Sequence, residues 1–422
     1  MERTLIYNIH QLLGVTDNDS PQNLNPLAGK NLRNLKVLED AWLEITDGLI
    51  SDFGVLEDLN KEQLNRANKV IDAQRGVLGP SWCDSHTHLV FAQPREEEFV
   101  MRILGKSYEE IAAAGGGILN SAKKVQQAAE ELLLESAYRR LNEIMAMGTG
   151  AVEIKSGYGL TPESELKMLR VIRSLKDKAP IPIKSTFLGA HAIPAEYKSS
   201  PEAYVDLVIE KMLPEVADQG LADYIDVFCD RGFFTPQQTD RILEAGLKRG
   251  LKAKIHANEL DYSGGVQVGV KHHAVSVDHL ECTGEDEIQS LLNGSTIPTL
   301  LPQTAFFLNI EYPPARKIID AGLPVALASD YNPGSSPSGN MFFTVALACI
   351  HMKMLPEEAI NAATINGAHA MEIQDIAGSI QKGRAANFWL TEPISSYNFL
   401  PYSFGRTPLK SIFINGNTFS TI

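Results

Sequence analysis

The sequence predicts an α/β fold, a (β/α)8 TIM-like barrel with a small β-sandwich domain built from both chain ends. Between about residues 78 and 376, short apolar runs alternate with longer helical patterns, a rhythm typical of βα units around a parallel sheet. Eight such runs occur, the number of strands in a closed barrel of this type. Both chain ends carry short alternating runs separated by turn residues, which indicates antiparallel strands.

The eight expected strands are runs of six to nine residues, at 81–86, 151–156, 183–191, 224–229, 251–257, 274–280, 296–302 and 324–330. Helical spacing of apolar residues follows over 121–146, where Ser121 is the expected N-cap, and over 161–175. We therefore expect a composite β-sandwich domain, 1–77 plus 377–422, and a barrel over 78–376.

Composition limits the binding partners and the cellular compartment that we expect for the protein. The 422 residues are 44% hydrophobic and carry a net charge of −14, with no run of Lys and Arg, so neither nucleic acid nor an anionic membrane is an expected partner. The four cysteines form no CxxC pair, which favours reduced thiols. The N-terminus is unlike a signal peptide and no apolar run reaches membrane length. A cytoplasmic protein without a membrane span is the prediction.

Histidines gather at the expected strand ends, where barrel enzymes carry out their chemistry. His86 and His88 end strand 1, His191 ends strand 3, His256 lies at strand 5, His279 lies at strand 6, and Asp330 closes strand 8. Side chains two residues apart on a strand point to the same side, so His86 and His88 can share one metal ion. A His-X-His pair alone is a weak signal, but His256 and Asp330 complete a ligand set open to water. That set suits Zn²⁺ or Fe.

This arrangement resembles the amidohydrolase superfamily of metal-dependent hydrolases, with His-X-His on strand 1, His on strands 5 and 6, and Asp on strand 8. Members with two metals carry a carboxylated Lys on strand 4. Here strand 4 reads YIDVFC, and Lys155 lies on strand 2, so the resemblance implies a single divalent or trivalent ion.

Within the superfamily, the chain is similar to the enzymes that open the ring of 4-imidazolone-5-propanoate. The stretches that carry this similarity are 152–160, 187–194, 224–234, 256–260, 277–281 and 327–335. The resemblance implies hydrolysis of this cyclic amide to N-formimidoyl-L-glutamate by a metal-activated water, as part of L-histidine degradation to glutamate. It also implies a homodimer.

The resemblance assigns catalysis to Glu259, His279 and Asp330. Asp330 is placed to take the proton of the water. His279 is placed to polarise the carbonyl or to receive that same proton, and the order stays open. Glu259 follows strand 5, where it can reach the ring nitrogens and move a proton to the leaving group. Its position alone favours a surface loop, and the similarity over 256–260 reverses that preference.

The resemblance assigns the substrate contacts to further residues. Arg95 is expected to clamp the propionate with its guanidinium fork, although Glu96–Glu98 follow directly and offer it ordinary ion pairs. The other expected contacts, which Glu259 joins, are Tyr158, His191, Asn332, Gly334 and Ser335. Gly334 lies in a Gly/Pro turn whose N–H groups could approach a carboxylate closely.

Two rival hypotheses fit parts of the pattern. A deaminase of a cyclic amidine, such as guanine or cytosine, would use the same single metal with His279 and Glu259. Such a substrate has no carboxylate tail and would not need Arg95. A barrel that binds metal without catalysis would have no physical reason to keep Glu259 and His279, so an enzyme is the stronger hypothesis.

Overall fold

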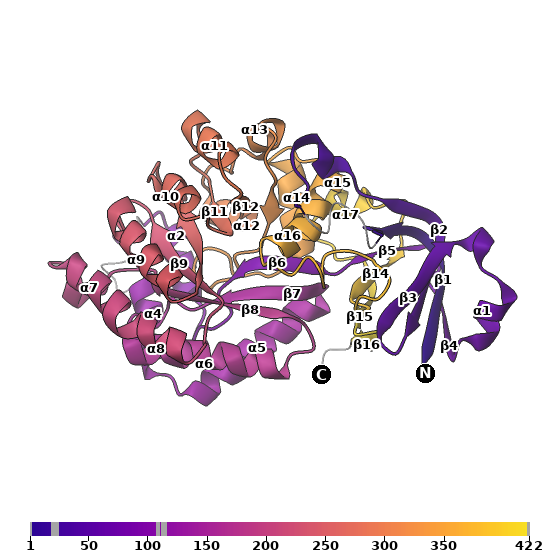
Figure 1. Ribbon diagram of the computed structural model, residues 1–422, viewed down its shortest axis with the longest axis horizontal. Helices are drawn as coiled ribbons and strands as arrows, with labels where there is room; N and C mark the ends of the chain where they lie inside the picture. Colours follow the sequence, from indigo (N-terminus) through magenta and orange to yellow (C-terminus); the bar gives the residue numbers. More distant parts are fainter. Residues whose placement is uncertain (1, 18–24, 107–109, 111–115, 420–422) are drawn as a thin grey trace.

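The computed structural model describes residues 2–17, 25–106, 110 and 116–419. Eight parallel strands form one sheet that curves into a nearly closed barrel (Figure 1). In spatial order the strands are β6 (Trp82–Thr87), β7 (Thr149–Lys155), β8 (Ile183–Ala190), β9 (Tyr224–Cys229), β10 (Lys252–Ala257), β11 (Ser276–His279), β12 (Ile297–Leu300) and β13 (Ala326–Leu327). Each predicted strand is present at its predicted place, and the predicted barrel is confirmed.

The barrel is closed between β13 and β6 by polar contacts. Asp84 of β6 accepts a hydrogen bond from the backbone N–H of Ser329 at 2.9 Å, and the Ser329 hydroxyl donates to the same carboxylate. One residue later, the N–H of Asp330 donates to the carbonyl of His86 at 3.0 Å. This seam therefore holds the end of β6 against the segment that carries Asp330.

Helices cover the outside of the barrel (Figure 1). In and around the barrel they are α2 (Glu96–Ile103), α4 (Ile118–Gln127), α5 (Glu130–Ala146), α6 (Pro162–Lys178), α7 (Pro201–Leu207), α8 (Leu213–Asp218), α9 (Pro236–Lys248), α10 (Gly265–Lys271), α11 (Glu285–Leu292), α12 (Pro302–Leu308), α13 (Ala315–Asp320), α14 (Met341–Ile350), α15 (Pro356–Ala363), α16 (Ile365–His369) and α17 (Phe399–Tyr402), with 3-10 turns η2 (Gly29–Arg33) and η4 (Ala195–Tyr197) and the π-helical turn η5 (Val208–Met212). No helix among the described residues combines the length and apolarity needed to cross a membrane.

The prediction of one helix over 121–146 is wrong in two respects. Extended backbone at Ala128 and Ala129 divides it into α4 and α5. The first helix begins at Ile118, after Gly117 at φ 84°, so Ser121 is an interior residue and not the N-cap. Apolar spacing continues across the break, which is why the sequence pattern does not reveal it. The helix expected over 161–175 is confirmed as α6, capped by the Thr161 hydroxyl.

The two chain ends share a second sheet beside the barrel, as predicted. Its indigo and yellow strands lie side by side at the right of Figure 1. The order is β16 (Asn417–Phe419), β15 (Leu409–Ile414), β14 (Phe388–Pro393), β5 (Gly76–Pro80), β1 (Arg3–Leu13), β2 (Val37–Thr46) and β3 (Leu49–Val55), with β4 (Lys69–Asp72) also on β1. A separate apolar cluster, including Ile6, Leu43 and Phe388, packs there.

The terminal sheet is mixed, whereas antiparallel strands were expected. β1 pairs antiparallel with β2 but parallel with both β4 and β5. After β3 the chain passes through η3 (Leu56–Asp58) and α1 (Lys61–Arg66) before it returns, and such a crossover allows parallel pairing. The expected limit between residues 77 and 78 falls within β5.

Candidate metal centre and active site

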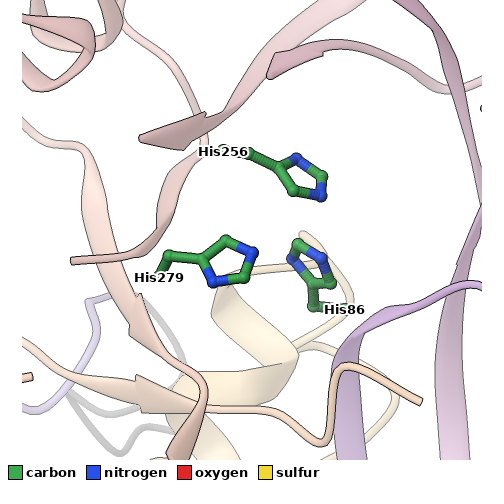
Figure 2. A group of neighbouring side chains, drawn as sticks. All are labelled: His86, His256 and His279. Atoms are coloured by element: carbon green, nitrogen blue, oxygen red, sulfur yellow. The ribbon is translucent and has the colours of Figure 1, made fainter. Parts of the chain in front are cut away.

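Three histidines from three barrel strands face one another in Figure 2. His86 of β6, His256 of β10 and His279 of β11 offer ring nitrogens that all lie within 4.8 Å of one another. All three residues are buried, at 2% exposure or less. Their spacing is short enough for one ion to contact all three.

A second group shares His86 with the first. His86, His88 and Asp330 also offer ligand atoms within 4.8 Å of one another. The Oδ1 atom of Asp330 lies 3.5 Å from His86 Nε2 and 3.6 Å from His88 Nε2. The ring centroid of His256 is 4.4 Å from that of His86 and 5.6 Å from that of His88. The structure thus gathers the four expected ligands, and His279, around one space.

Two of the histidines make the contacts that are usual for metal-binding histidines. The Nδ1 atom of His86 lies 2.6 Å from Asp278 Oδ2, and that of His256 lies 3.0 Å from Asp226 Oδ2. The Nε2 atoms of both rings are buried and have no hydrogen-bond partner in the described part of the chain. Metal-binding histidines usually donate their second nitrogen to a carboxylate in this way. The donor set is therefore one that Zn²⁺ or Fe accepts.

The barrel interior favours the neutral form of these rings. Burial lowers the pKa of His86 and His88 well below the ordinary value of 6.5. Positive charge on Lys155 lowers the pKa of His86 further, and His191 does the same for His88. A neutral imidazole is the form that binds a metal ion, so the centre does not have to lose protons near neutral pH.

One oxygen of Asp330 is already held by the protein. Thr304, on α12, donates its hydroxyl to Asp330 Oδ2 at 2.6 Å, which leaves Oδ1 toward His86 and His88. Asp330 has φ 54° and His279 has φ 85°, values that side-chain-bearing residues rarely adopt. Strained backbone of this kind concentrates at functional sites, because the surrounding structure must enforce it.

Glu259 and His279, the expected proton-transfer groups, lie together. The distance from Glu259 Oε2 to His279 Nε2 is 3.7 Å, and Glu259 is largely buried rather than on the surface. On the other side of the ring, Oε2 of Glu281 lies 3.6 Å from His279 Nδ1. Burial raises the pKa of Glu259, while the charges of Glu259 and Glu281 raise that of His279 against its burial. His279 therefore stands between two carboxylates.

Tyr158 and His191 adjoin the metal-binding group. The His191 ring is stacked on His88 with centroids 5.3 Å apart, and Tyr158 lies 5.7 Å from His88 and 5.2 Å from His191. Burial lowers the pKa of His191 to about 3, so its ring is neutral at ordinary pH. Its Nδ1 lies 3.0 Å from the Gly157 carbonyl, which leaves Nε2 for another partner.

Arg95 is a buried guanidinium against the turn that follows Asp330. Only 8% of its side chain is exposed, and its Nε has no hydrogen-bond partner within the described residues. It touches just one of the acidic residues that follow it, Glu98, at 3.6 Å. A Cβ atom at Gly334 would lie 1.1 Å from Arg95 Nη2, so only glycine leaves room for this guanidinium.

The turn of Asn332, Gly334 and Ser335 is closed by its own hydrogen bonds. The backbone N–H groups of Gly334 and Ser335 donate to Asn332 Oδ1 at 2.7 and 2.8 Å. The Asn332 amide donates to the Asp330 carbonyl at 2.7 Å. The N–H groups expected to bind a carboxylate are thus engaged within the turn, and the group presented beside Gly334 is the Arg95 side chain.

Comparison with known proteins identifies the family of the chain. Residues 78–419 match the amidohydrolase family. The chain belongs to that family. The imidazolonepropionase of Christiangramia forsetii is 54% identical over 98% of each chain, and that of Flavobacterium johnsoniae is 53% identical over 98% of this chain and 99% of its own. The imidazolonepropionase of Geobacillus kaustophilus is 43% identical over 93% of this chain and 92% of its own.

Solved structures share the fold of this amidohydrolase at low sequence identity. E. coli guanine deaminase superposes with a TM-score of 0.72 at 13% identity, covering 100% of this chain and 99% of its own. A triazine hydrolase variant also gives 0.72, at 15% identity, covering 99% of this chain and 94% of its own. At such identities the likeness concerns the barrel and its terminal sheet alone.

Sequence reasoning about this amidohydrolase missed the carboxylates that support the site. Asp226 and Asp278, which hold His256 and His86, lie inside expected strands, where a buried charge requires a partner. The need of a buried charge for a partner draws attention to these two aspartates, but it does not tell which residue each one contacts. Glu281 lies in the 277–281 stretch that carries the family similarity, but the sequence assigns it no role, and Thr304 has no signal in the sequence.

Glu165 was missed as well. It lies on α6 and accepts hydrogen bonds from the backbone N–H groups of Gly157, Gly159 and Leu160, at 3.1, 2.7 and 2.9 Å. These residues form the turn that presents Tyr158. A Cβ atom at Gly159 would lie 2.4 Å from the Glu165 backbone nitrogen, so glycine is needed for the turn to wrap this carboxylate.

Proposed function

We propose that this amidohydrolase hydrolyses the cyclic amide of 4-imidazolone-5-propanoate to N-formimidoyl-L-glutamate, a step of L-histidine degradation to glutamate. The observation that carries the proposal is the buried Arg95 beside the histidine and aspartate group. A guanidinium with donors to spare suits a substrate that has a carboxylate tail on a small ring. Relatives named imidazolonepropionase, at up to 54% identity over nearly the whole chain, support the same substrate.

The metal proposal is one ion held by His86, His88, His256 and Asp330, either Zn²⁺ or Fe. When bound, such an ion lowers the pKa of a coordinated water to roughly 7 and polarises the carbonyl that is attacked. A single ion is also supported by β9, which contains no lysine, whereas two-metal members of the superfamily carry one on this strand; Phe228 lies near the end of β9. Its ring packs against His256 and His279, with centroids 5.7 and 6.5 Å apart.

The residues around the ion have separate roles in binding and orienting the substrate. Arg95 binds the propionate and fixes the ring in one orientation, and Tyr158 and His191 offer hydrogen bonds beside His88. Asn332, Gly334 and Ser335 shape the wall on which Arg95 rests, and a direct bond from their N–H groups would require the turn to exchange its own. Holding substrate and nucleophile in fixed geometry supplies much of the rate enhancement.

Proton transfer falls to Glu259, His279 and Asp330. Asp330 Oδ1 or His279 accepts the proton of the attacking water, and Glu259, in its ionised form, takes up that proton and delivers it to the ring nitrogen that leaves. The 3.7 Å between His279 Nε2 and Glu259 Oε2 allows the two groups to act on one substrate. Homodimer assembly stays a prediction of the resemblance, and a cytoplasmic location stays a prediction of the composition.

A turnover assay tests the proposal. Freshly generated imidazolonepropionate is incubated with the purified chain, its ultraviolet absorbance is followed, and the product is identified by mass. We expect loss of substrate with formation of N-formimidoyl-L-glutamate, and little ammonia release from guanine under the same conditions. Release of ammonia from guanine or cytosine without ring opening of imidazolonepropionate would favour a deaminase and refute the proposal.

A further inference from the structure

Five charged side chains fill the barrel interior next to the histidines, and we call them the charged layer. They are Glu153 and Lys155 of β7, Asp226 of β9, Lys254 of β10 and Asp278 of β11. Each side chain has 0% exposure. Burying ionised groups is costly unless they are paired, so such a layer needs a reason beyond stability.

Lys155 is the centre of the charged layer. Its Nζ lies 2.6 Å from Glu153 Oε1, 2.8 Å from Asp226 Oδ2 and 3.5 Å from Asp278 Oδ2. Burial alone would lower the pKa of Lys155, but these three carboxylates raise it above the ordinary value. The amine is therefore charged, and with three carboxylates around it Lys155 is a cation and not a metal ligand.

The two aspartates that Lys155 holds are those that hold the histidines. Asp278 Oδ2 contacts both Lys155 and, at 2.6 Å, His86 Nδ1. Asp226 Oδ2 contacts both Lys155 and, at 3.0 Å, His256 Nδ1. No other cation in the described part of the chain is found in contact with both aspartates. A single ammonium group thus joins the supports of two rings whose Nε2 atoms face the same space.

Lys254 provides an internal comparison. It is equally buried and belongs to the same charged layer, but its Nζ contacts Glu153 and, at 3.2 Å, the carbonyl of Ser85. The structure shows no contact of this amine with Asp226 or Asp278. Lys254 is thus a second buried lysine of the charged layer that holds neither ring support.

We propose that Lys155 is a positioning residue of the metal centre, which fixes Asp226 and Asp278 and, through them, the rings of His256 and His86 in the orientation that binds the ion. This inference rests on the metal site of the proposed function. Partners one step removed from metal ligands typically contribute 10- to 100-fold in metal affinity, because they fix ring orientation and tautomer.

Electrostatics and positioning predict opposite effects of removing this lysine. The charged layer holds three carboxylates and two ammonium groups, a net charge of −1 by this count. Replacement of either lysine by methionine leaves −2, which attracts a metal cation more strongly. Loss of ring positioning, by contrast, weakens metal binding. Whether the affinity for the metal rises or falls therefore separates the electrostatic effect from the positioning effect.

The experiment compares Lys155→Met with Lys254→Met in the full chain. Each protein is stripped of metal, and its Zn²⁺ affinity is measured by competition with a chromophoric chelator. The visible spectrum of bound Co²⁺ is recorded as a second readout, because it reports coordination geometry. We expect Lys155→Met to bind Zn²⁺ about 10-fold or more weakly than the unsubstituted chain, with an altered Co²⁺ spectrum. Lys254→Met should bind at least as tightly as the unsubstituted chain.

A double variant shows whether Lys155 acts through Asp278. Asp278→Asn should weaken Zn²⁺ binding by itself, and adding Lys155→Met should then cost clearly less than it does alone, because the His86 ring is already released and only the support of His256 remains to be lost. If Lys155→Met fails to fold, Lys155→Gln, which keeps a hydrogen-bond donor, replaces it, with Lys254→Gln as its control.

Two results would contradict different parts of the proposal. Equal or tighter Zn²⁺ binding by Lys155→Met, with an unchanged Co²⁺ spectrum, would overturn the positioning role while leaving the metal site in place. Absence of Zn²⁺ and Co²⁺ binding in the unsubstituted chain would instead remove the metal site on which the proposed function depends.

Discussion

At the scale of single residues, the proposed substrate rests on Arg95. Its guanidinium is buried, touches Glu98 at 3.6 Å and keeps Nε without a hydrogen-bond partner among the described residues. The family resemblance favours a substrate role for Arg95, although the three glutamates that follow it offer ordinary ion pairs. Packing against Gly334, which no sequence pattern reveals, favours the substrate role.

We predict that Arg95→Ala raises KM for imidazolonepropionate and lowers kcat/KM about 10- to 100-fold. The reason is that a hydrogen bond to a charged group contributes about 1.5–3 kcal/mol, and tenfold corresponds to about 1.4 kcal/mol. Steady-state kinetics measure this. Arg95→Lys should recover only part of the loss, since it keeps the charge without the fork. Gly334→Ala should resemble Arg95→Ala, because its methyl group displaces the guanidinium. Unchanged KM in both would argue against a bound propionate.

Glu259 makes a prediction about pH. Burial raises its pKa above the ordinary 4.5. Under the proposed function Glu259 must be ionised to take up the proton that it carries to the leaving nitrogen, and a raised pKa keeps it protonated to a higher pH. The acid-side loss of kcat/KM should therefore begin at a higher pH than an exposed glutamate would give. Glu259→Gln should lose most activity, and its residual rate should lack this acid limb. The pH profile of kcat/KM is the measurement, and an identical acid limb in both proteins would show that another group titrates.

At the scale of elements, the sequence predicts the barrel strands but not the break between α4 and α5 or the parallel pairing of β1. Alternation of apolar runs with helical patterns marked all eight barrel strands, because each must bury side chains against the helices outside. Extended backbone at Ala128 and Ala129 interrupts a continuous helical pattern, and parallel pairing of β1 with β4 depends on a crossover. Neither feature leaves a periodic trace in the sequence.

The turn from Gly157 to Leu160 carries the element-scale prediction. Three of its N–H groups converge on the buried carboxylate of Glu165, so this side chain sets where Tyr158 points. Glu165→Gln keeps one acceptor oxygen and should lower the free energy of unfolding by about 1–3 kcal/mol and raise KM. Denaturant unfolding and steady-state kinetics measure the two effects.

Tyr158→Phe provides the control for that turn. It leaves the turn intact, so it should raise KM with little change in stability. A Glu165→Gln protein that is destabilised but has an unchanged KM would mean that the turn contributes only to folding.

At the scale of the whole molecule, the site joins segments far apart in the chain. His86 and Asp330 are separated by most of the barrel and meet because β6 lies against the segment that follows β13. The barrel rule predicted this meeting, since strand ends of a closed barrel share one mouth. The carboxylates behind the histidines could not be paired by that rule, because their partners depend on side-chain reach across the interior.

Metal removal should destabilise the whole chain. An ion that binds only the folded state adds about 4 kcal/mol when its free concentration is 1,000 times its Kd. Dialysis against a chelator should therefore lower the midpoint of thermal unfolding, and added Zn²⁺ or Fe²⁺ should restore it. Equal midpoints with and without metal would mean that the histidine group is not a tight site.

Anomalous diffraction from metal-loaded crystals, with metal content measured on the same protein, tests the central claim most directly. We expect one ion per chain and one anomalous peak within about 2.0–2.3 Å of His86, His88, His256 and Asp330. A peak held by His86, His256 and His279 without His88 and Asp330, or two peaks, or none among these residues, would contradict a centre in which one ion is held by the four expected ligands.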